Sequence, residues 1–303
     1  KAYPQMASLK SLTKTNGGKD IWLLTIGTGK TETKPAIAVI GGVEGNHLLG
    51  AELAIGFAEQ LLKGSSTDSI RALLNRTTYY VFPNMSPDAM EQYFSKLRAG
   101  RTGNATATDD DRDGKNDEDG WDDLDGDGNI TMMIRKSPTG RFIKDPLDPR
   151  KLMAVGPDQV GDYEMLGQEG LDNDGDGEVN EDGVGYYDPN RDWGWNWQPD
   201  YIQRGAMRYP FTLPENRAVM EFVMKHPNIA GAQSFHNSGG MILRGPGAEE
   251  DINTYNQNDI RIYDAIGKKG EEMIPGYRYL TVYKDLYSVF GGELDWFYGN
   301  RGI

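Results

Sequence analysis

Strand-like and helix-like patterns alternate along both end regions of the chain. Short apolar runs, typical of buried strands, occur at residues 21–26, 36–40, 79–82 and 229–235. Apolar residues spaced three and four apart predict helices over residues 48–62, 215–225 and 252–266. Strands that alternate with helices favour an α/β fold. We therefore predict a single domain with a mixed, mostly buried central sheet flanked by helices.

The alternation stops in the middle of the chain, where Asp, Gly and Asn dominate. Within this stretch residues 111–120 match residues 174–183 in register, and residues 123–131 share the opening of the pattern. Apolar residues are too few there to form a core of their own. We therefore predict that residues 105–183 are an acidic Asp/Gly-rich loop insertion within one domain that spans residues 1–303.

The acidity of the chain is concentrated in this insertion. The formal net charge is −14. Residues 109–127 hold eleven acidic and two basic residues, and residues 169–182 hold seven acidic and no basic ones, so the rest of the chain carries about +2. Nucleic acid is therefore not an expected partner, because binding it requires a basic surface. No apolar run is long enough to span a bilayer, so we also expect no membrane span.

Three Asp-rich loops in the insertion have the pattern of cation-binding loops. Carboxylates at alternate positions converge on one point, and the glycine that follows them allows a sharp turn. None of the loops has the glutamate at position 12 that an EF-hand uses, and a solvated acidic linker is the alternative interpretation. Because so many carboxylates would repel one another without a cation, we predict calcium sites. The candidate ligands are Asp109, Asp111, Asp113, Asp117, Asp119, Asp123, Asp125, Asp127, Asp172, Asp174, Asp176, Asn180 and Asp182.

Two histidines and one glutamate lie where predicted strands end. The chain has no cysteine, and therefore no thiol nucleophile and no cysteine metal site. Glu44 and His47 lie between a strand and a helix, and His236 directly follows another strand, in positions where α/β proteins bind ligands. Two imidazoles and a carboxylate, with water in the fourth position, form a catalytic zinc set, so these three residues are candidate zinc ligands, with structural histidines as the alternative. The third histidine, His226, precedes Pro227 at a helix end, where a capping or surface role is expected.

Four motifs accompany these candidate ligands: FPNMSPD at 82–88, DPNRDW at 188–193, SFHNSGG at 234–240 and YSVFGGELDW at 287–296. In content and in order they resemble motifs of the carboxypeptidase A-like family of zinc carboxypeptidases. The second resembles the family segment D-x-N-R-N-[FW], the third the segment with the last zinc ligand, and the fourth the segment Y-x-x-x-G-G-x-x-D-W. Only the acidic insertion falls outside the resemblance.

The chain departs from the family pattern in two ways. The family has its first two ligands in the order H-x-x-E, whereas Glu44 and His47 are exchanged. The ligand set and its charge are unchanged, so we expect zinc binding to survive with altered geometry or affinity. The family's general base is a glutamate beyond the position of Ile303, where this sequence stops. We expect the native chain to continue to that glutamate and the 303-residue piece alone to be nearly inert; loss of the base is the alternative.

The resemblance implies roles for five further side chains. Asn190 and Arg191 would hold the terminal carboxylate of the substrate, a bidentate task suited to Arg. Arg101 would polarise the oxyanion, and Tyr287 would cover the substrate. Leu294 would form the floor of the specificity pocket, which favours an apolar or uncharged terminal residue.

Structural roles are the alternative for most of these residues. Arg191 could serve only as an ion-pair partner, and Arg101 could be a surface charge. Arg98 competes with Arg101 as the match to the family's arginine. Tyr287 and Leu294 could be ordinary core residues.

The resemblance implies a zinc-dependent metallocarboxypeptidase that hydrolyses the C-terminal bond of peptides with a free carboxylate, with metal-bound water as nucleophile. Two alternatives remain: an amidase or carboxypeptidase acting on peptidoglycan stem peptides, and a catalytically inactive binding module stabilised by zinc and calcium. Lys1 is not a natural start, so we expect that a leader has been removed. Calcium loops of this kind favour a secreted or periplasmic protein.

Overall fold

The computed structural model describes three ranges of the chain: residues 2–98, 104–237 and 239–303. These residues form two compact units. The first unit comprises residues 2–93, 104–106, 185–237 and 239–303. The second comprises residues 94–98 and 107–184. None of the helices in the described ranges is long and apolar enough to cross a lipid bilayer.

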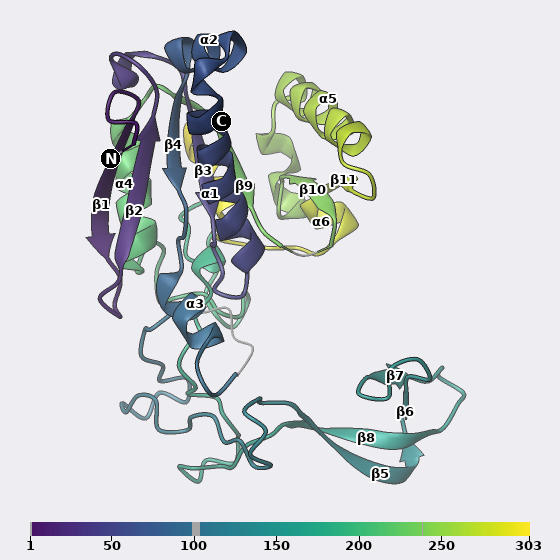
Figure 1. The fold of residues 1–303 in the computed structure, drawn as a ribbon. Helices are drawn as coiled ribbons and strands as arrows, with labels where there is room; N and C mark the ends of the chain where they lie inside the picture. The colour runs from purple at the N-terminus through teal and green to yellow at the C-terminus, as the bar shows by residue number, and fades with distance from the viewer. Residues whose placement is uncertain (1, 99–103, 238) are drawn as a thin grey trace. The chain divides into compact units, whose positions relative to one another are not determined.

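A five-stranded mixed sheet in the order β1-β2-β4-β3-β9 forms the centre of the first unit (Figure 1). Its strands are β1 (Ala7–Lys14), β2 (Asp20–Ile26), β3 (Ala36–Gly41), β4 (Thr78–Phe82) and β9 (Ile229–Phe235). Strand β3 pairs in parallel with β4 and with β9, while β1 and β2 form an antiparallel edge. All five residues of β4 are buried, as expected for a strand covered on both faces. The four predicted strands are confirmed, and β1 is an additional edge strand.

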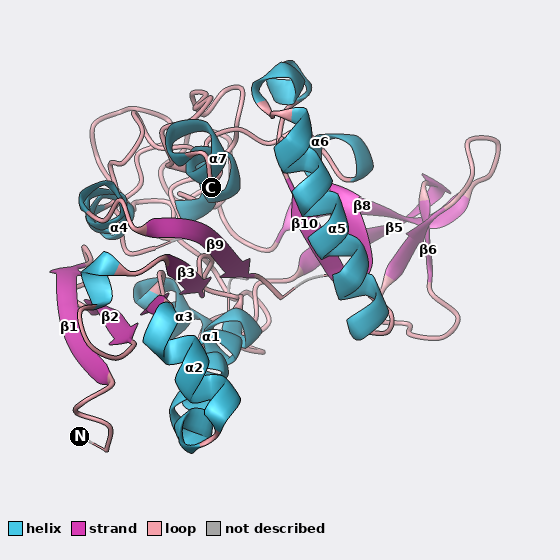
Figure 2. Cartoon of the chain, turned by 90° about the horizontal axis from the view of Figure 1, so that it is seen from above, coloured by secondary structure: helices cyan, strands magenta, loops and turns pink. Residues whose placement is uncertain are grey.

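Helices cover both faces of this sheet (Figure 2). One face carries α1 (Leu48–Lys63) and α2 (Asp68–Arg76), and the other carries α4 (Pro214–Lys225) and α7 (Glu293–Arg301). The core on the first face includes Val39, Ala54, Leu61, Leu74 and Val81. The core on the second face includes Ile40, Phe82, Val219, Phe222 and Trp296. This layered arrangement confirms the predicted α/β fold class.

Local sequence signals determine where these helices begin and end. Gly64 directly follows α1 as its C-cap. The Thr67 side chain accepts a hydrogen bond from the backbone N–H of Ile70 and so caps α2. Pro214 occupies the first turn of α4, where its missing N–H would have no helical partner.

A smaller parallel pair of strands, β10 (Met241–Arg244) and β11 (Arg278–Thr281), packs against α5 (Gln257–Met273) in the same unit. The helix predicted over residues 252–266 is confirmed only in part. A 3-10 helix, η4 (Glu249–Thr254), precedes it, and α5 begins after Asn256, whose side chain accepts a bond from the N–H of Asn258. The remaining short helices are η1 (Thr31–Thr33), η2 (Gly64–Ser66), α3 (Pro87–Tyr93), η3 (Pro189–Arg191) and α6 (Val282–Asp285).

The second unit contains a four-stranded antiparallel sheet in the order β5-β8-β6-β7. Its strands are β5 (Met132–Gly140), β6 (Phe142–Lys144), β7 (Leu152–Ala154) and β8 (Gly161–Gln168). The insertion therefore holds more regular structure than the loop we expected. Most residues of β5 and β8 are exposed, so backbone pairing rather than a buried core defines this sheet. A prediction from apolar content could not detect it.

Candidate metal centre

The central parallel strands bring the three candidate ligands together. Glu44 and His47 lie in the loop between β3 and α1, and His236 directly follows β9. Strands β3 and β9 are neighbours whose ends are in register, with Gly41 opposite Phe235. Residues that follow parallel strands share one edge of the sheet, which explains why positions so distant in sequence meet there.

Glycines make the close approach of these segments possible. Gly42 has a φ of +62°, a backbone conformation that other residues adopt only with strain. Gly50, in the first turn of α1, lies so close to the backbone carbonyl of Phe235 that any side chain would collide with it. The start of α1 and the end of β9 are therefore held together next to the candidate ligands.

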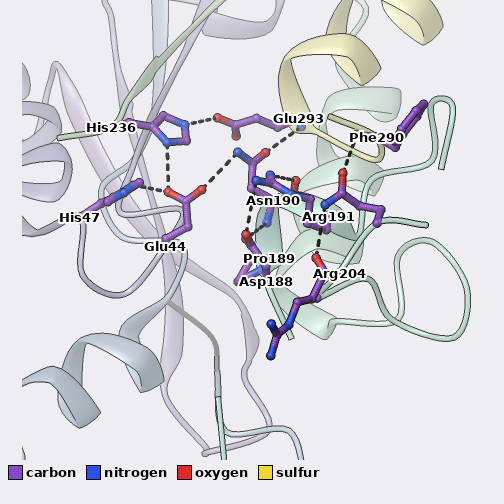
Figure 3. Close-up of polar contacts among 12 residues, drawn as sticks. Glu44, His47, Asp188, Pro189, Asn190, Arg191, Arg204, His236, Phe290 and Glu293 are labelled. Carbon is purple, nitrogen blue, oxygen red and sulfur yellow. Dashed lines mark hydrogen bonds and ion pairs between the residues drawn. The ribbon is translucent and has the colours of Figure 1, made fainter. Parts of the chain in front are cut away.

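The side chains of Glu44, His47 and His236 face one another (Figure 3). Ligand atoms from all three lie within 4.8 Å of one another. Glu44 Oε2 lies 3.0 Å from Nδ1 of His236 and also contacts Nδ1 of His47. The Glu44 residue is only 5% exposed.

The two imidazoles dominate the electrostatics of Glu44. Burial alone would raise the pKa of this carboxyl, but His236 and His47 outweigh it and hold the pKa well below its ordinary range. Burial would lower the pKa of His236, whereas Glu293 and Glu44 raise it well above its ordinary value. The ring of His236 thus lies between two carboxylates.

The donor atoms fit a zinc ion. Glu44 Oε2 and His47 Nδ1 are buried, and apart from the contacts within this cluster they have no hydrogen-bond partner in the described chain. Two imidazole nitrogens and one carboxylate oxygen are a zinc donor set. Glu44 and Glu293 are buried and Asp188 is partly buried, and Arg191 pairs with Asp188, so a divalent cation would offset the remaining negative charge.

The side chain of Asn190 connects two of these carboxylate residues. Its Nδ2 donates to Oε1 of Glu44 at 3.2 Å, and its Oδ1 accepts the backbone N–H of Glu293 at 3.1 Å. Both ends of the amide are therefore engaged within the protein. Its role in holding a substrate carboxylate stays a prediction.

Arg191 is held by its own loop. It lies in η3, where Asp188 accepts the backbone N–H of Asn190 and caps the turn. Its Nη1 donates to the Asn190 carbonyl at 2.7 Å, and Nη2 lies 3.7 Å from Oδ2 of Asp188. Burial raises the pKa of Asp188, and the positive charge of Arg191 opposes this rise.

Glu293 is a polar neighbour of the cluster that the sequence analysis missed. It is the first residue of α7, is 2% exposed, and has Oε1 3.3 Å from Nε2 of His236. A helix N-terminus is a favourable place for a carboxylate. The signal was the acidic residue in Gly-Gly-Glu-Leu-Asp-Trp, directly before Leu294 in a motif already singled out.

The other predicted site residues are less closely connected with the cluster. Tyr287 lies in the loop before α7, is 59% exposed, and makes no side-chain hydrogen bond within the described ranges. Leu294 is half-buried on α7. Arg101 lies outside the described residues, and Arg98 is exposed in the second unit.

The three Asp-rich loops of the second unit share one hydrogen-bond pattern. In each, an aspartate accepts the backbone N–H two residues later, at 2.9 Å for Asp111, 3.0 Å for Asp125 and 3.1 Å for Asp174. The in-register repeats also share a backbone conformation, since Asp117 and Asn180 both have a φ of 60°. The sequence repeat is therefore a structural repeat.

Carboxylates converge in each loop, with ligand atoms within 4.8 Å in three groups: Asp109/Asp111/Asp113, Asp123/Asp125/Glu169 and Asp172/Asp174/Asp176. The second group contains Glu169 and not Asp127. Glu169 is buried and accepts the backbone N–H groups of Thr131 and Leu124, and the bonds from Thr131 contribute most to keeping its pKa below the usual value. It lies too far along the sequence for a local motif to have indicated it.

Two buried carboxylates link the first and third loops. Asp119 Oδ2 accepts the N–H of Asn180 at 2.8 Å, and Asp182 Oδ1 accepts the N–H of Asp110 at 2.5 Å. Both aspartates are at most 1% exposed. Burial and, to a smaller extent, nearby carboxylates such as Glu118 raise the pKa of Asp182. The first and third loops thus hold several carboxylates close to one another.

The chain belongs to the zinc carboxypeptidase family, whose model matches residues 1–141 and 168–303. The unmatched residues lie in the second unit and include β6, β7 and all of β8 except its last residue. This result confirms the family indicated by the motifs.

Curated relatives match a part of the chain. Carboxypeptidase E of Caenorhabditis elegans is 32% identical over 93 residues, which are 29% of this chain and 20% of that protein. Human carboxypeptidase D is 31% identical over 94 residues, which are 30% of this chain and 7% of that protein. The matched region thus spans a fifth of these relatives or less.

Solved structures share the fold over nearly the whole chain. Carboxypeptidase A from Helicoverpa armigera has a TM-score of 0.60 at 16% identity, covering 98% of this chain and 57% of that one. Bovine thrombin-activatable fibrinolysis inhibitor has a TM-score of 0.59 at 14% identity, covering 98% and 76%. At such identities the likeness concerns the fold alone.

Proposed function

We propose that this protein is a zinc-dependent metallocarboxypeptidase that removes the C-terminal residue of peptides with a free carboxylate. The observation that carries the proposal is the meeting of Glu44, His47 and His236 at the end of the central strands, in a chain of the zinc carboxypeptidase family. These residues would hold the metal. When bound, zinc supplies a Lewis acid that activates water and polarises a carbonyl.

The exchanged order of Glu44 and His47 is compatible with this assignment. Both residues belong to one short turn, and both direct a donor atom to the side of His236. The set therefore still offers two nitrogens and one oxygen at one point. We propose that the exchange alters the affinity for zinc rather than abolishing it.

Arg191 supports the choice of a free C-terminal carboxylate as the group recognised. Its side chain is 13% exposed and lies in the loop whose Asn190 contacts Glu44. A guanidinium fixed by Asp188 is a strong partner for a carboxylate, because charge-assisted hydrogen bonds are stronger than neutral ones. We propose that Arg191, rather than the fully engaged Asn190 amide, carries most of the substrate recognition, and Tyr287 and Leu294 remain candidates for covering and selecting the terminal residue.

The test is hydrolysis of matched peptides by protein expressed from its complete reading frame. Free-acid peptides should be shortened by one residue, and their C-terminally amidated counterparts should be spared. Cleavage of amidated or peptidoglycan stem peptides with free-acid peptides left intact would favour an amidase. Zinc binding without cleavage of any of these substrates would favour an inactive binding module.

We further propose that the loops of the second unit bind calcium and that the protein is secreted or periplasmic. Glu169 supports the first part, because this buried carboxylate adds a ligand to Asp123 and Asp125 from outside their loop. Asp119 and Asp182, which link two loops, support it as well. Weak loop sites of this kind are filled at the millimolar calcium found outside cells.

A further inference from the structure

Four residues around the candidate zinc site form a closed ring of polar contacts (Figure 3). Glu44 Oε1 accepts from Asn190 Nδ2, and Asn190 Oδ1 accepts the backbone N–H of Glu293. Glu293 Oε1 lies 3.3 Å from His236 Nε2, and His236 Nδ1 lies 3.0 Å from Glu44 Oε2. The ring joins two candidate ligands, Glu44 and His236, through two residues that are not ligands themselves.

The two nitrogens of His236 face different partners. Nδ1 points to Glu44 Oε2, the atom that also contacts His47, and Nε2 points to Glu293. In the neutral imidazole only one nitrogen carries a proton, and the other is free to bind a metal. A carboxylate beside Nε2 favours the proton there, which leaves the lone pair on Nδ1, on the side of the other two ligands.

We propose that Glu293 is a positioning residue that fixes the orientation and tautomer of His236 and thereby strengthens zinc binding. This inference rests on the proposed zinc site. Glu293 is itself fixed, because its backbone N–H is bound to Asn190 and its side chain is 3% exposed. A carboxylate held in this way orients the imidazole before the metal binds, so the ring loses little further freedom on binding.

An ordinary structural role does not account for this side chain. A carboxylate that merely supports a helix start would bind free N–H groups of the first turn, whereas no hydrogen bond to Glu293 Oε2 is found in the described chain. Asp295 on the same helix has a structural role of a different kind, since it accepts the backbone N–H of Gly247 and the hydroxyl of Tyr255, which lie outside the helix.

The experiment compares zinc affinity, measured by competition with a chelator, among the wild type, Glu293→Gln and Glu293→Ala. The alanine variant should bind zinc about 10- to 100-fold more weakly. The glutamine variant keeps an acceptor oxygen without the charge, so its loss should be smaller. In the cobalt-substituted protein, the visible absorption of the metal should change in both variants because the ligand field at His236 changes.

Asp295→Asn is the matched control, because it makes the same chemical change at a 4% exposed position of the same helix, where the carboxylate bonds to Gly247 and Tyr255 instead of to a candidate ligand. It should leave zinc affinity and the cobalt spectrum unchanged. Zinc affinity of Glu293→Ala within twofold of the wild type would overturn the inference, provided that His236→Ala loses zinc. If Glu293→Ala does not fold, an unchanged affinity and spectrum in Glu293→Gln would overturn it equally. Retention of zinc by His236→Ala would instead reject the proposed zinc site itself.

Discussion

At the scale of single residues, the three histidines of the chain lie in different surroundings. His47 and His236 share the carboxylate of Glu44, whereas His226 places Nδ1 2.7 Å from the carbonyl of Phe222 and stacks on the ring of that residue. His226 thus serves the end of α4, in line with the capping role expected from the sequence. This difference provides an internal control for metal binding.

The first prediction concerns zinc content. His47→Ala and His236→Ala should each reduce bound zinc from one ion per chain to a small fraction, because each removes one of three protein donors. His226→Ala should retain the full content. Elemental analysis of the purified variants measures this. Unchanged zinc in either of the first two variants would exclude that histidine from the site.

The second prediction concerns Arg191. Replacement by alanine removes a charge-assisted contact with the substrate carboxylate, so kcat/KM on free-acid peptides should fall by about 10- to 100-fold. Slow hydrolysis of amidated peptides, where detectable, should hardly change. Steady-state kinetics on the matched pair measures the difference. Equal losses on both peptides would indicate a structural role for Arg191, the ion-pair alternative.

The sequence identifies candidate site residues that stand in local motifs, but it does not show the contacts that depend on tertiary folding. Glu44, His47 and His236 follow strands and stand in recognisable segments. Glu293 also stands in one of these motifs, but its contact with His236 arises because α7 begins beside the end of β9, which no local pattern shows. The hydrogen bonds of the Asn190 amide to Glu44 and Glu293 likewise depend on tertiary folding.

At the scale of elements, buried strands were predicted and exposed ones were not. Strands β3 and β4 are nearly continuous apolar runs, because helices cover both of their faces. Strand β1 is an edge with Leu9 62% exposed, and β5 has Met132 43% exposed, so neither has the apolar signature. Strand pairing through the backbone leaves no trace in hydrophobicity, which is why the sequence predicts a loop where the second unit has a four-stranded sheet.

The third prediction concerns the Asp-rich loops. Calcium should raise the thermal midpoint and a chelator should lower it, because a cation bound only by the folded loops stabilises them by mass action. Asp125→Asn should weaken this response by removing one converging carboxylate. Asp145→Asn, in the same unit but at a turn outside the loops, should leave the response intact. A thermal midpoint that changes neither with added calcium nor with a chelator would contradict the calcium proposal.

At the scale of the whole molecule, the family fold lies mainly in the first unit. The family model omits residues 142–167, which hold β6, β7 and all of β8 except its last residue in the sheet of the second unit. The zinc candidates lie in one unit and the calcium candidates in the other. Removal of zinc and removal of calcium should therefore be separable in their effects.

Buried carboxyl groups in the first unit make global stability depend on pH. Glu215, in the first turn of α4, is 2% exposed, and its Oε2 has no hydrogen-bond partner in the described ranges. Burial raises its pKa to about 7, and Asp88 and Asp192 add to the rise. Between the ordinary carboxyl pKa and this value, the folded state binds more protons than the unfolded state, so this group's contribution to the free energy of unfolding falls as pH rises.

The fourth prediction follows from this decrease in the contribution of Glu215 to the free energy of unfolding as pH rises. Glu215→Gln removes the titrating group, so the variant should gain stability relative to the wild type as pH rises from about 4.5 to about 7, by on the order of 2–3 kcal/mol. Above pH 7 the difference should stay constant. Glu221→Gln, an exposed position on the same helix, should show no such trend. Denaturant unfolding across this pH range measures the difference, and a constant offset between Glu215→Gln and the wild type would show that Glu215 ionises in the folded protein as readily as in the unfolded chain.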